Sequence, residues 1–244
     1  RLGLDRLRAA NGETLDMKYR AIPVIEDACQ AAGSAIGEQM AGNTGIAAAF
    51  SLHPLKNLNA WGDGGVVTTN NDYVAGRLRL LRNHGLQDRD TCIIPGYNSR
   101  LDTIQAIVAL EALGELHYVV SRRRHNAMML DRLLEGSGFS PLPRYSNTTH
   151  SFHLYQGLVA ENRDDFLAYL LEHEIEAKMH YPIPLHLQPG FASLGYTEGD
   201  FPVAERMAAQ TVSLPIHQFL TEEQIHFMAQ TIIAYGTKKY AQSA

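Results

Sequence analysis

Short apolar runs and helical repeats organise the first half of the chain. The run at 21–26 (AIPVIE) is short and β-branched, which predicts a buried parallel strand, and two more strands are expected at about 46–52 and 65–69. Apolar residues at helical spacing then predict a helix that Asp72 caps and Gly85 ends. We therefore expect a sheet of short strands accompanied by helices.

A long helical pattern links this region to the rest of the chain. Apolar residues recur at helical spacing from about Asp102 to the glycines at 136–138. A helix of this length is typical of a bridge between two domains. We therefore place a domain boundary near Arg124, with a large domain at 1–124 and a smaller one at 125–244.

The second region has a different pattern, which favours a small α+β domain. Thr221 and Gln224 have the spacing of a capping box that opens a helix. The predicted elements are an antiparallel strand within 151–160, a helix at about 163–173, a strand at 175–181 and a helix at 222–235.

Composition and charge narrow the function. The 244 residues are 45% hydrophobic and 19% charged, as in a globular protein with a real core. The net charge is -5, which argues against a nucleic-acid partner, and we expect the basic run Arg122–Arg124 to be a solvated helix face. No apolar run approaches the ~20 residues that span a bilayer, so no membrane partner is expected.

The cysteines and histidines do not form a metal or disulfide pattern. Cys29 and Cys92 are far apart and outside any C-x-x-C spacing, which fits a reducing cytosol and predicts a cytoplasmic protein. His150 and His153 lack a matching cysteine or carboxylate pattern. We therefore predict no metal site.

Three polar clusters carry the candidate chemistry. They are EDACQ with Asp27 and Gln30, SLHPLKNLNAWGDGG with Ser51 and Lys56, and GYNSRLD with Asn98. Asp27 ends a predicted strand, at the sheet edge where α/β proteins bind ligands. Each cluster alone also fits a structural role as a turn or a helix cap.

Physical chemistry connects the clusters. A partly desolvated lysine is a nucleophile toward carbonyl groups, and the Leu-rich, Trp-containing surroundings of Lys56 could desolvate it. A carboxylate such as Asp27 can hold a protonated ring nitrogen, while Ser51, glycines and an asparagine can bind a phosphate. These are the protein parts of a pyridoxal 5'-phosphate (PLP) site.

The joint pattern resembles a known family. The segments VIEDACQAAGS, FSLHPLKNLNAWGDGGVVTTN, GYNSRLDTIQA and HYPIPLHLQP are similar to those of the DegT/DnrJ/StrS-type sugar aminotransferases. The resemblance implies PLP fold type I, as in aspartate aminotransferase. Its α/β fold has a three-layer α/β/α large domain, here apparently incomplete at the N-terminus, and a smaller C-terminal α+β domain.

The resemblance also implies the cofactor residues. Lys56 would form the Schiff base with PLP and shuttle the proton, and Asp27 would pair with the pyridinium nitrogen. Gln30 would lie near the ring, and Ser51 would bind the phosphate. Asn98 would reach the phosphate of the neighbouring subunit's cofactor, which implies a homodimer with active sites at its interface.

Substrate residues are implied in the second region. Tyr181 and His186, in HYPIPLH, would line the substrate entrance, and Arg100 and His180 are further candidates for binding substrate anions. Arg100 could instead pair with Asp102.

The implied activity is transfer of an amino group, with glutamate as donor, to a nucleotide-diphosphate-linked ketosugar. An aminotransferase for a cyclitol (scyllo-inosose-type) ketone remains an alternative. So does a non-catalytic homologue that acts as a binding or regulatory subunit. A related PLP-dependent sugar dehydratase is disfavoured, since those enzymes carry histidine where this chain has Lys56.

The resemblance runs from about Pro23 to the C-terminus. Family members usually carry a substantial segment before VIEDA, with further strands, a phosphate-binding pair and an aromatic that stacks on the ring. Residues 1–20 do not resemble the usual approach to that strand. We therefore expect the chain to represent part of a longer protein.

Overall fold

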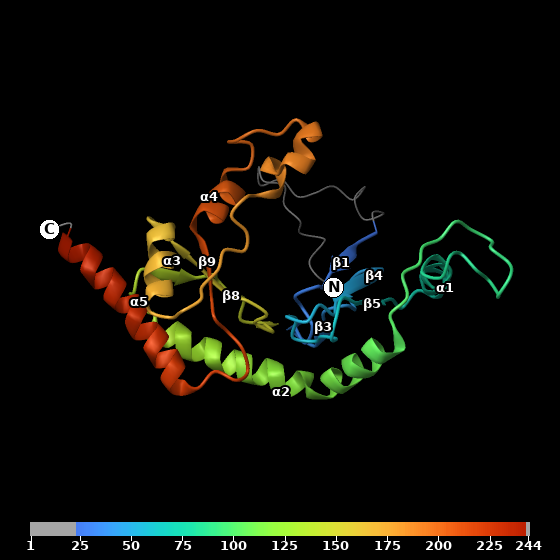
Figure 1. Ribbon diagram of the computed structural model, residues 1–244, viewed down its shortest axis with the longest axis horizontal. Coiled ribbons are helices and arrows are strands. Elements are labelled where there is room, and N and C mark those ends of the chain that lie inside the picture. The colour runs from blue at the N-terminus through green and yellow to red at the C-terminus, as the bar shows by residue number, and fades with distance from the viewer. Residues whose placement is uncertain (1–22, 243–244) are drawn as a thin grey trace. The chain divides into compact units, whose positions relative to one another are not determined.

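The chain forms two compact units. The computed structural model describes residues 23–242, with the backbone alone at 238–242. Unit 1 extends to Tyr118 and includes Ser146–Ser151, while unit 2 comprises Val119–Tyr145 and the chain from Phe152 onward. Figure 1 shows their elements along the chain. The functional domain boundary near Arg124 stays a prediction.

Unit 1 contains two small sheets. In the first, of order β1-β4-β5, β1 runs parallel to β4 and β4 antiparallel to β5, with Asp27 opposite Ala49. The second, of order β3-β2-β7, was not predicted and brings 148–149 back to unit 1. The strands are β1 Ile25–Asp27, β2 Ala35–Ile36, β3 Gln39–Met40, β4 Ala47–Ser51, β5 Gly65–Thr68 and β7 Thr148–Thr149.

The predicted burial of the first strand is wrong. The first residues of that prediction, 21–22, lie outside the described residues, and Ile25 is 71% exposed. Within the described residues β1 has a neighbour only on its β4 side. An apolar β-branched run predicts a buried environment, but the described part of the sheet does not provide one.

Helix α1 (Asp72–Leu81) begins one residue earlier than predicted, because its N-cap is Asn71. The Asn71 side chain accepts a hydrogen bond from the Val74 amide at 3.1 Å. Asp72 lies in the first turn, where its charge complements the helix dipole. Gly85, at φ +73°, donates its amide to the Leu80 carbonyl and ends the segment as expected.

Helix α2 (Thr103–Leu133) confirms the long predicted helix and spans both units (Figure 1). Its buried residues begin at Val119, whereas Ile104, Ile107 and Leu110 near its start are exposed. Among the described helices, α2 has the length and composition to cross a membrane. One such helix is only a weak indication of a membrane span.

Unit 2 is built on an antiparallel sheet of order β6-β8-β9. Along β8 the residues Tyr155, Gly157 and Val159 are buried, which is the alternation expected of one core face. The elements are β6 Phe139–Pro141, β8 Tyr155–Val159, α3 Arg163–Glu172, η3 Leu185–Leu187, η4 Pro189–Leu194, α4 Pro202–Gln210, β9 Thr211–Leu214 and α5 Glu222–Gln242.

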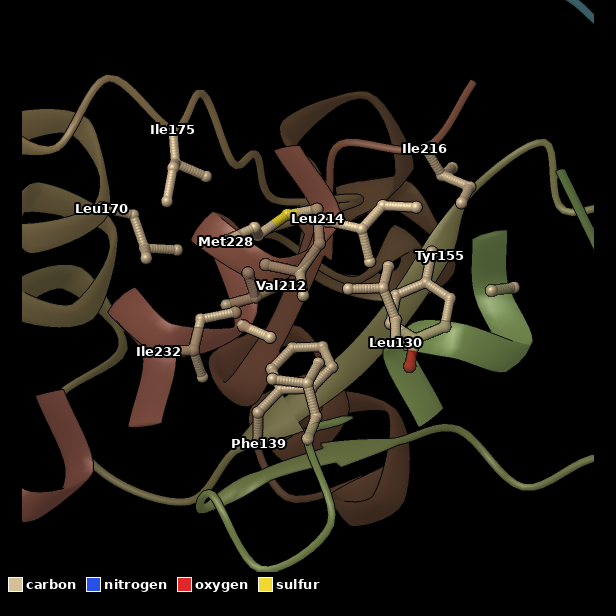
Figure 2. Packing of buried hydrophobic residues seen from close by; sticks show 14 of the residues in the cluster. Leu130, Phe139, Tyr155, Leu170, Ile175, Val212, Leu214, Ile216, Met228 and Ile232 are labelled. Carbon is tan, nitrogen blue, oxygen red and sulfur yellow. The ribbon is translucent and has the colours of Figure 1, made fainter. Parts of the chain in front are cut away.

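The core of unit 2 joins this sheet to three helices. Figure 2 shows Tyr155 of β8 and Val212 of β9 among Leu130 of α2, Leu170 of α3 and Ile232 of α5. These side chains are almost completely buried. Burial of this apolar surface stabilises unit 2 and fixes the C-terminal half of α2 against it.

Two predictions for unit 2 had opposite outcomes. The capping box is confirmed, since the Thr221 amide donates to Gln224 Oε1 at 3.0 Å and the Gln224 amide to Thr221 Oγ1 at 3.2 Å. The strand at 175–181 is wrong, because only Lys178 forms an isolated bridge, with Ser213. Ser213 belongs to strand β9, which follows α4 directly. The four residues of β9 are too short a pattern for the strand to be predicted from sequence.

The expectation that Arg122–Arg124 is a solvated face is wrong at its central residue. Arg123 is only 8% exposed and donates to the carbonyls of Phe152 at 2.9 Å and Ile216 at 3.0 Å. Burial lowers the pKa of Arg123 to about 10. Consecutive residues of an α-helix point in different directions, so Arg123 can face the core while its neighbours in the basic run do not.

We expect Arg123→Ala to lower the free energy of unfolding by about 3 kcal/mol, because two buried carbonyls lose their donor and a cavity forms. Arg124→Ala, at its partly exposed neighbour, is the control and should change it by about 0.5 kcal/mol or less. Urea unfolding of both variants measures the difference. Equal effects would contradict the inward-facing role of Arg123.

Candidate active site

The candidate site lies at the carboxyl edge of β1 and β4. The two strands are parallel, so their C-terminal residues Asp27 and Ser51 emerge at the same edge. The loop that follows β4 carries Lys56. The structure therefore places Asp27 at the same sheet edge as Ser51 and the Lys56 loop, which follow it 24 to 29 positions later in the sequence.

Asp27 and Lys56 interact electrostatically. The Cys29 thiol and the Cys29 amide, whose nitrogen lies 3.1 Å from Asp27 Oδ1, lower the pKa of Asp27, and the charge of Lys56 lowers it further. Asp27 in turn raises the pKa of the Cys29 thiol. Asp27 is therefore an ionised carboxylate at neutral pH, as a partner for a protonated ring nitrogen must be.

The loop around Lys56 is held by its own hydrogen bonds. The Lys56 amide donates to the His53 carbonyl at 2.9 Å, and Asn59 Nδ2 donates to the Lys56 carbonyl at 2.9 Å. The Ala60 amide bonds to the Leu52 carbonyl at 2.8 Å. These bonds fix the backbone that presents the lysine.

The glycine turn at 62–65 returns the chain to the sheet, as expected. The Leu52 amide donates to the Gly64 carbonyl at 2.8 Å, and Ser51 lies opposite Gly65 in the β4–β5 ladder. A Cβ at Gly64 would approach Leu101 Cδ1 to 2.7 Å, so a larger residue there would require the end of the Leu101 side chain to shift.

The apolar residues expected to desolvate Lys56 do not cover it. Trp61 is 80% exposed and Leu55 is also exposed, so neither shields the loop. Buried Leu52 and Ala60 support it instead. The sequence pattern counted apolar residues but could not show which of them point inward.

Asn57 and Ser151 were not predicted, yet they anchor the lysine loop. Asn57 is only 6% exposed, and its Nδ2 donates to the Ser151 carbonyl at 2.9 Å. The fully buried Ser151 hydroxyl accepts from Ser34 Oγ at 2.9 Å and donates to the Gln30 carbonyl at 3.3 Å. A polar residue beside a lysine gives no sequence signal of burial, and Ser151 comes from a distant segment.

Glu26, next to Asp27, is a second unpredicted anchor. Its carboxylate accepts the amides of Gly42 at 2.8 Å, Thr44 at 2.6 Å and Gly45 at 2.7 Å. Burial alone would raise the pKa of Glu26, but the hydrogen bonds from Thr44, Gly45 and Gly42 outweigh burial and lower it to about 2. Glu26 thus ties the loop before β4 to β1.

This depressed pKa predicts an acid-dependent loss of stability. The contribution of Glu26 should be complete above pH 4.5 and lost as the pH falls toward 2. We expect about 2 kcal/mol for this partly buried group, and Glu26→Gln should remove most of that dependence. Urea unfolding between pH 7 and pH 2 measures it, with exposed Glu38→Gln as the control. Parallel pH curves for wild type and Glu26→Gln would contradict this role.

The other predicted site residues of unit 1 are exposed to solvent. Asn98 forms an isolated backbone bridge with Asn83, and its side chain is exposed. Arg100 donates to Asn83 Oδ1 at 3.2 Å, so its local partner is Asn83 and not Asp102. Gln30 is exposed and contributes its carbonyl to the Ser151 contact.

The predicted substrate residues of unit 2 lie beside a cavity of about 850 Å³. His180 Nδ1 is 2.9 Å from Ser213 Oγ, and the His180 carbonyl accepts from Gln156 Nε2 at 2.9 Å. Tyr181 is 64% exposed, whereas the His186 side chain is only 8% exposed and bonds to Glu205 at 2.9 Å. Most of the lining is apolar, from Pro182, Ile183, Pro184, Leu185, Phe201, Ala204, Met207 and Ala208.

The residues present fit PLP in chemical type. An ionised carboxylate, a primary amine and a hydroxyl lie around the edge of β1 and β4. Among the described residues, no three histidine, cysteine, aspartate or glutamate side chains gather where they could hold a metal ion. The arrangement therefore favours an organic cofactor with an aldehyde and a phosphate.

Proteins of similar sequence include a named transaminase. The chain is 40% identical over 221 residues to "Pleiotropic regulatory protein" of Geobacillus stearothermophilus, covering 89% of this chain and 59% of the relative. It is 37% identical to "dTDP-3-amino-3,4,6-trideoxy-alpha-D-glucose transaminase" of Micromonospora megalomicea subsp. nigra, covering 84% and 56%. The chain thus spans less than two thirds of the length of these relatives.

Solved structures agree with the sequence comparison. DesV of S. venezuelae, in complex with a ketimine intermediate, superposes with a TM-score of 0.86 at 34% identity, covering 90% of this chain and 59% of that one. A DegT DnrJ EryC1 StrS aminotransferase from Brucella abortus gives 0.83 at 31% identity, covering 88% and 57%. These neighbours confirm the expected α/β class, PLP fold type I.

The family assignment follows from a match along most of the chain. A family model described as "DegT/DnrJ/EryC1/StrS aminotransferase family" matches residues 17–233. It covers both units and all the predicted site residues. The chain therefore belongs to the DegT/DnrJ/EryC1/StrS aminotransferase family.

Proposed function

We propose that this protein is a PLP-dependent aminotransferase that converts the keto group of a nucleotide-diphosphate-linked sugar to an amine, with glutamate as donor. The observation that carries the proposal is the placement of ionised Asp27 within electrostatic reach of Lys56 at the carboxyl edge of β1 and β4. Relatives named as dTDP- and UDP-sugar aminotransferases support the nucleotide-sugar substrate over a cyclitol ketone.

Each of the three candidate cofactor residues has a distinct role in the proposed reaction. Bound PLP supplies an electron sink for the carbon that loses its proton. Asp27, ionised at neutral pH, would hold the ring nitrogen protonated. Lys56 would attach the cofactor and move the proton at the reacting carbon, and the Ser51 hydroxyl would bind the phosphate.

We further propose that the active unit is a homodimer. Asn98 is exposed, as a residue that reaches a neighbouring subunit's cofactor phosphate must be. Gln30 lies near the cofactor ring in this proposal. Arg100, His180 and Tyr181 are the proposed substrate contacts.

A regulatory function is a second candidate, because two relatives carry such names. These are "Pleiotropic regulatory protein" and, at 37% identity, "Erythromycin biosynthesis sensory transduction protein EryC1" of Saccharopolyspora erythraea. The candidate lysine and carboxylate are nevertheless present in this chain and within electrostatic reach. A non-catalytic homologue would have no need for this pairing, so we favour the enzyme.

The test separates cofactor attachment from turnover. Full-length protein incubated with PLP and reduced with borohydride should carry the cofactor on Lys56, as located by peptide mass spectrometry. Unreduced protein with glutamate and a panel of dTDP- and UDP-ketosugars should then yield an aminosugar. Absence of the Lys56 adduct would contradict the enzyme, and an adduct without any aminosugar would favour the regulatory candidate.

A further inference from the structure

Glu205 on α4 is bonded on several sides, although the reaction does not use it. Its Oε1 accepts the amides of Gly199 at 3.0 Å and Phe201 at 3.1 Å, and its Oε2 accepts Gly199 at 2.9 Å. His186 Nε2 lies 2.9 Å from the same Oε1. The Glu205 side chain is largely buried, so one carboxylate joins α4, the loop before it and His186.

His186 is the fixed end of the segment that carries the proposed substrate contacts. Its ring lies 4.8 Å from the Phe201 ring and is buried on that side. At the other end, His180 is held by Ser213 and by Gln156. Between these anchors Tyr181 stays mostly exposed.

This arrangement separates two roles. An exposed phenol such as Tyr181 can meet a ligand, whereas the His186 side chain is largely buried and its Nε2 is already bonded to Glu205. The cavity beside the segment is lined both by residues 181–186 and by α4. A shift of His186 would therefore change the cavity wall and release one of the two anchors of the segment that carries Tyr181.

We propose that Glu205 is a positioning residue for the ketosugar, acting through His186 to hold the 180–186 segment in place. The inference rests on the proposed function. It assigns His186 a supporting role and leaves contact with the sugar to Tyr181. Geometry of this kind matters because a displacement of about 1 Å can cost about a hundredfold in rate.

The two half-reactions separate this role from general stabilisation. In full-length holoenzyme, Glu205→Ala should lower kcat/KM for the ketosugar by about tenfold to a hundredfold, mainly through KM. The rate of the glutamate half-reaction, followed by the visible absorbance of the bound cofactor, should stay within about twofold of wild type. Glu205→Gln keeps an accepting oxygen and should retain most of the ketosugar kcat/KM.

A double-mutant cycle tests whether Glu205 acts through His186. The combined Glu205→Ala/His186→Ala variant should lose no more ketosugar kcat/KM than the worse single variant. Glu198→Ala, an exposed carboxylate in the loop before α4, is the control and should behave as wild type. If Glu205→Ala fails to fold, Glu205→Asp carries the same comparison, because its shorter side chain cannot reach His186 and the loop amides together. Its loss is expected only in the ketosugar half-reaction and should be absent from the His186→Ala background.

Three results would overturn the inference. These are an unchanged ketosugar kcat/KM in Glu205→Ala, or in Glu205→Asp where that variant replaces it, equal losses in both half-reactions, or multiplicative losses in the double variant. Each requires a wild-type enzyme that binds PLP and aminates a ketosugar. A wild-type protein without cofactor absorbance would contradict the proposed function itself, so the two failures are distinguishable.

Discussion

Replacing Lys56 with alanine is expected to abolish transamination, with kcat reduced by about a thousandfold or more. The amine that attaches the cofactor and carries the proton is then missing, and within the described residues Lys56 is the lysine whose charge acts on Asp27. Fold should be retained, because backbone bonds and the Asn57 side chain hold the loop and remain in the variant. Steady-state rates and the borohydride adduct measure the two losses.

Lys178→Ala is the matched control for this prediction. Lys178 is an exposed lysine of unit 2 that pairs with Glu176, and its removal should leave both the adduct and the rate unchanged. A Lys56→Ala protein that still aminates a ketosugar at more than about a tenth of the wild-type rate would contradict the assignment of the nucleophile.

Replacing Asp27 with asparagine is expected to lower kcat by about a hundredfold to a thousandfold. The amide cannot supply the negative charge that keeps a ring nitrogen protonated, so the electron sink weakens. Wild-type Asp27 is charged throughout the neutral range, and Cys29 and Lys56 lower its pKa further below the ordinary aspartate value. Single-turnover rates with glutamate measure the effect apart from sugar binding.

Controls for Asp27→Asn must exclude unfolding. Asp72→Asn removes an exposed carboxylate from the first turn of α1 and should leave kcat unchanged. The free energy of unfolding of Asp27→Asn should lie within about 1 kcal/mol of the wild-type value, since Asp27 is exposed. An Asp27→Asn enzyme within threefold of the wild-type rate would show that this carboxylate does not tune the cofactor.

Glu26 and Asp27 illustrate how far sequence reasoning reaches. Both are carboxylates at the end of one strand, and their order alone does not separate their roles. Register and pairing do so, because Glu26 meets three amides of the 42–45 loop while Asp27 meets Cys29 and Lys56. A prediction that selected Asp27 was possible from the motif, whereas the anchoring role of Glu26 needed the loop in place.

Helix signals were predicted well where they are local. The capping box of Thr221 and Gln224 and the long repeat of α2 depend on neighbours within a few residues. The strand expected at 175–181 failed because strand formation depends on a partner, and β9 offers that segment only the Lys178 bridge. The prediction that Arg123 is solvated was wrong for a related reason, since a basic run does not show which of its positions faces the core.

By itself, the sequence determined the family, the cofactor type and the identity of the chemical groups, because these depend on residue types at set spacings. It also determined the helices that local periodicity and caps specify. Only the tertiary structure decided which groups meet. The parallel register of β1 and β4 places Asp27 near the Lys56 loop, and long-range hydrogen bonds bring Ser151 to Asn57 and Glu205 to His186. Contacts between distant segments have no local signature, because their free energy arises from packing and hydrogen bonding that exist only after the chain has folded.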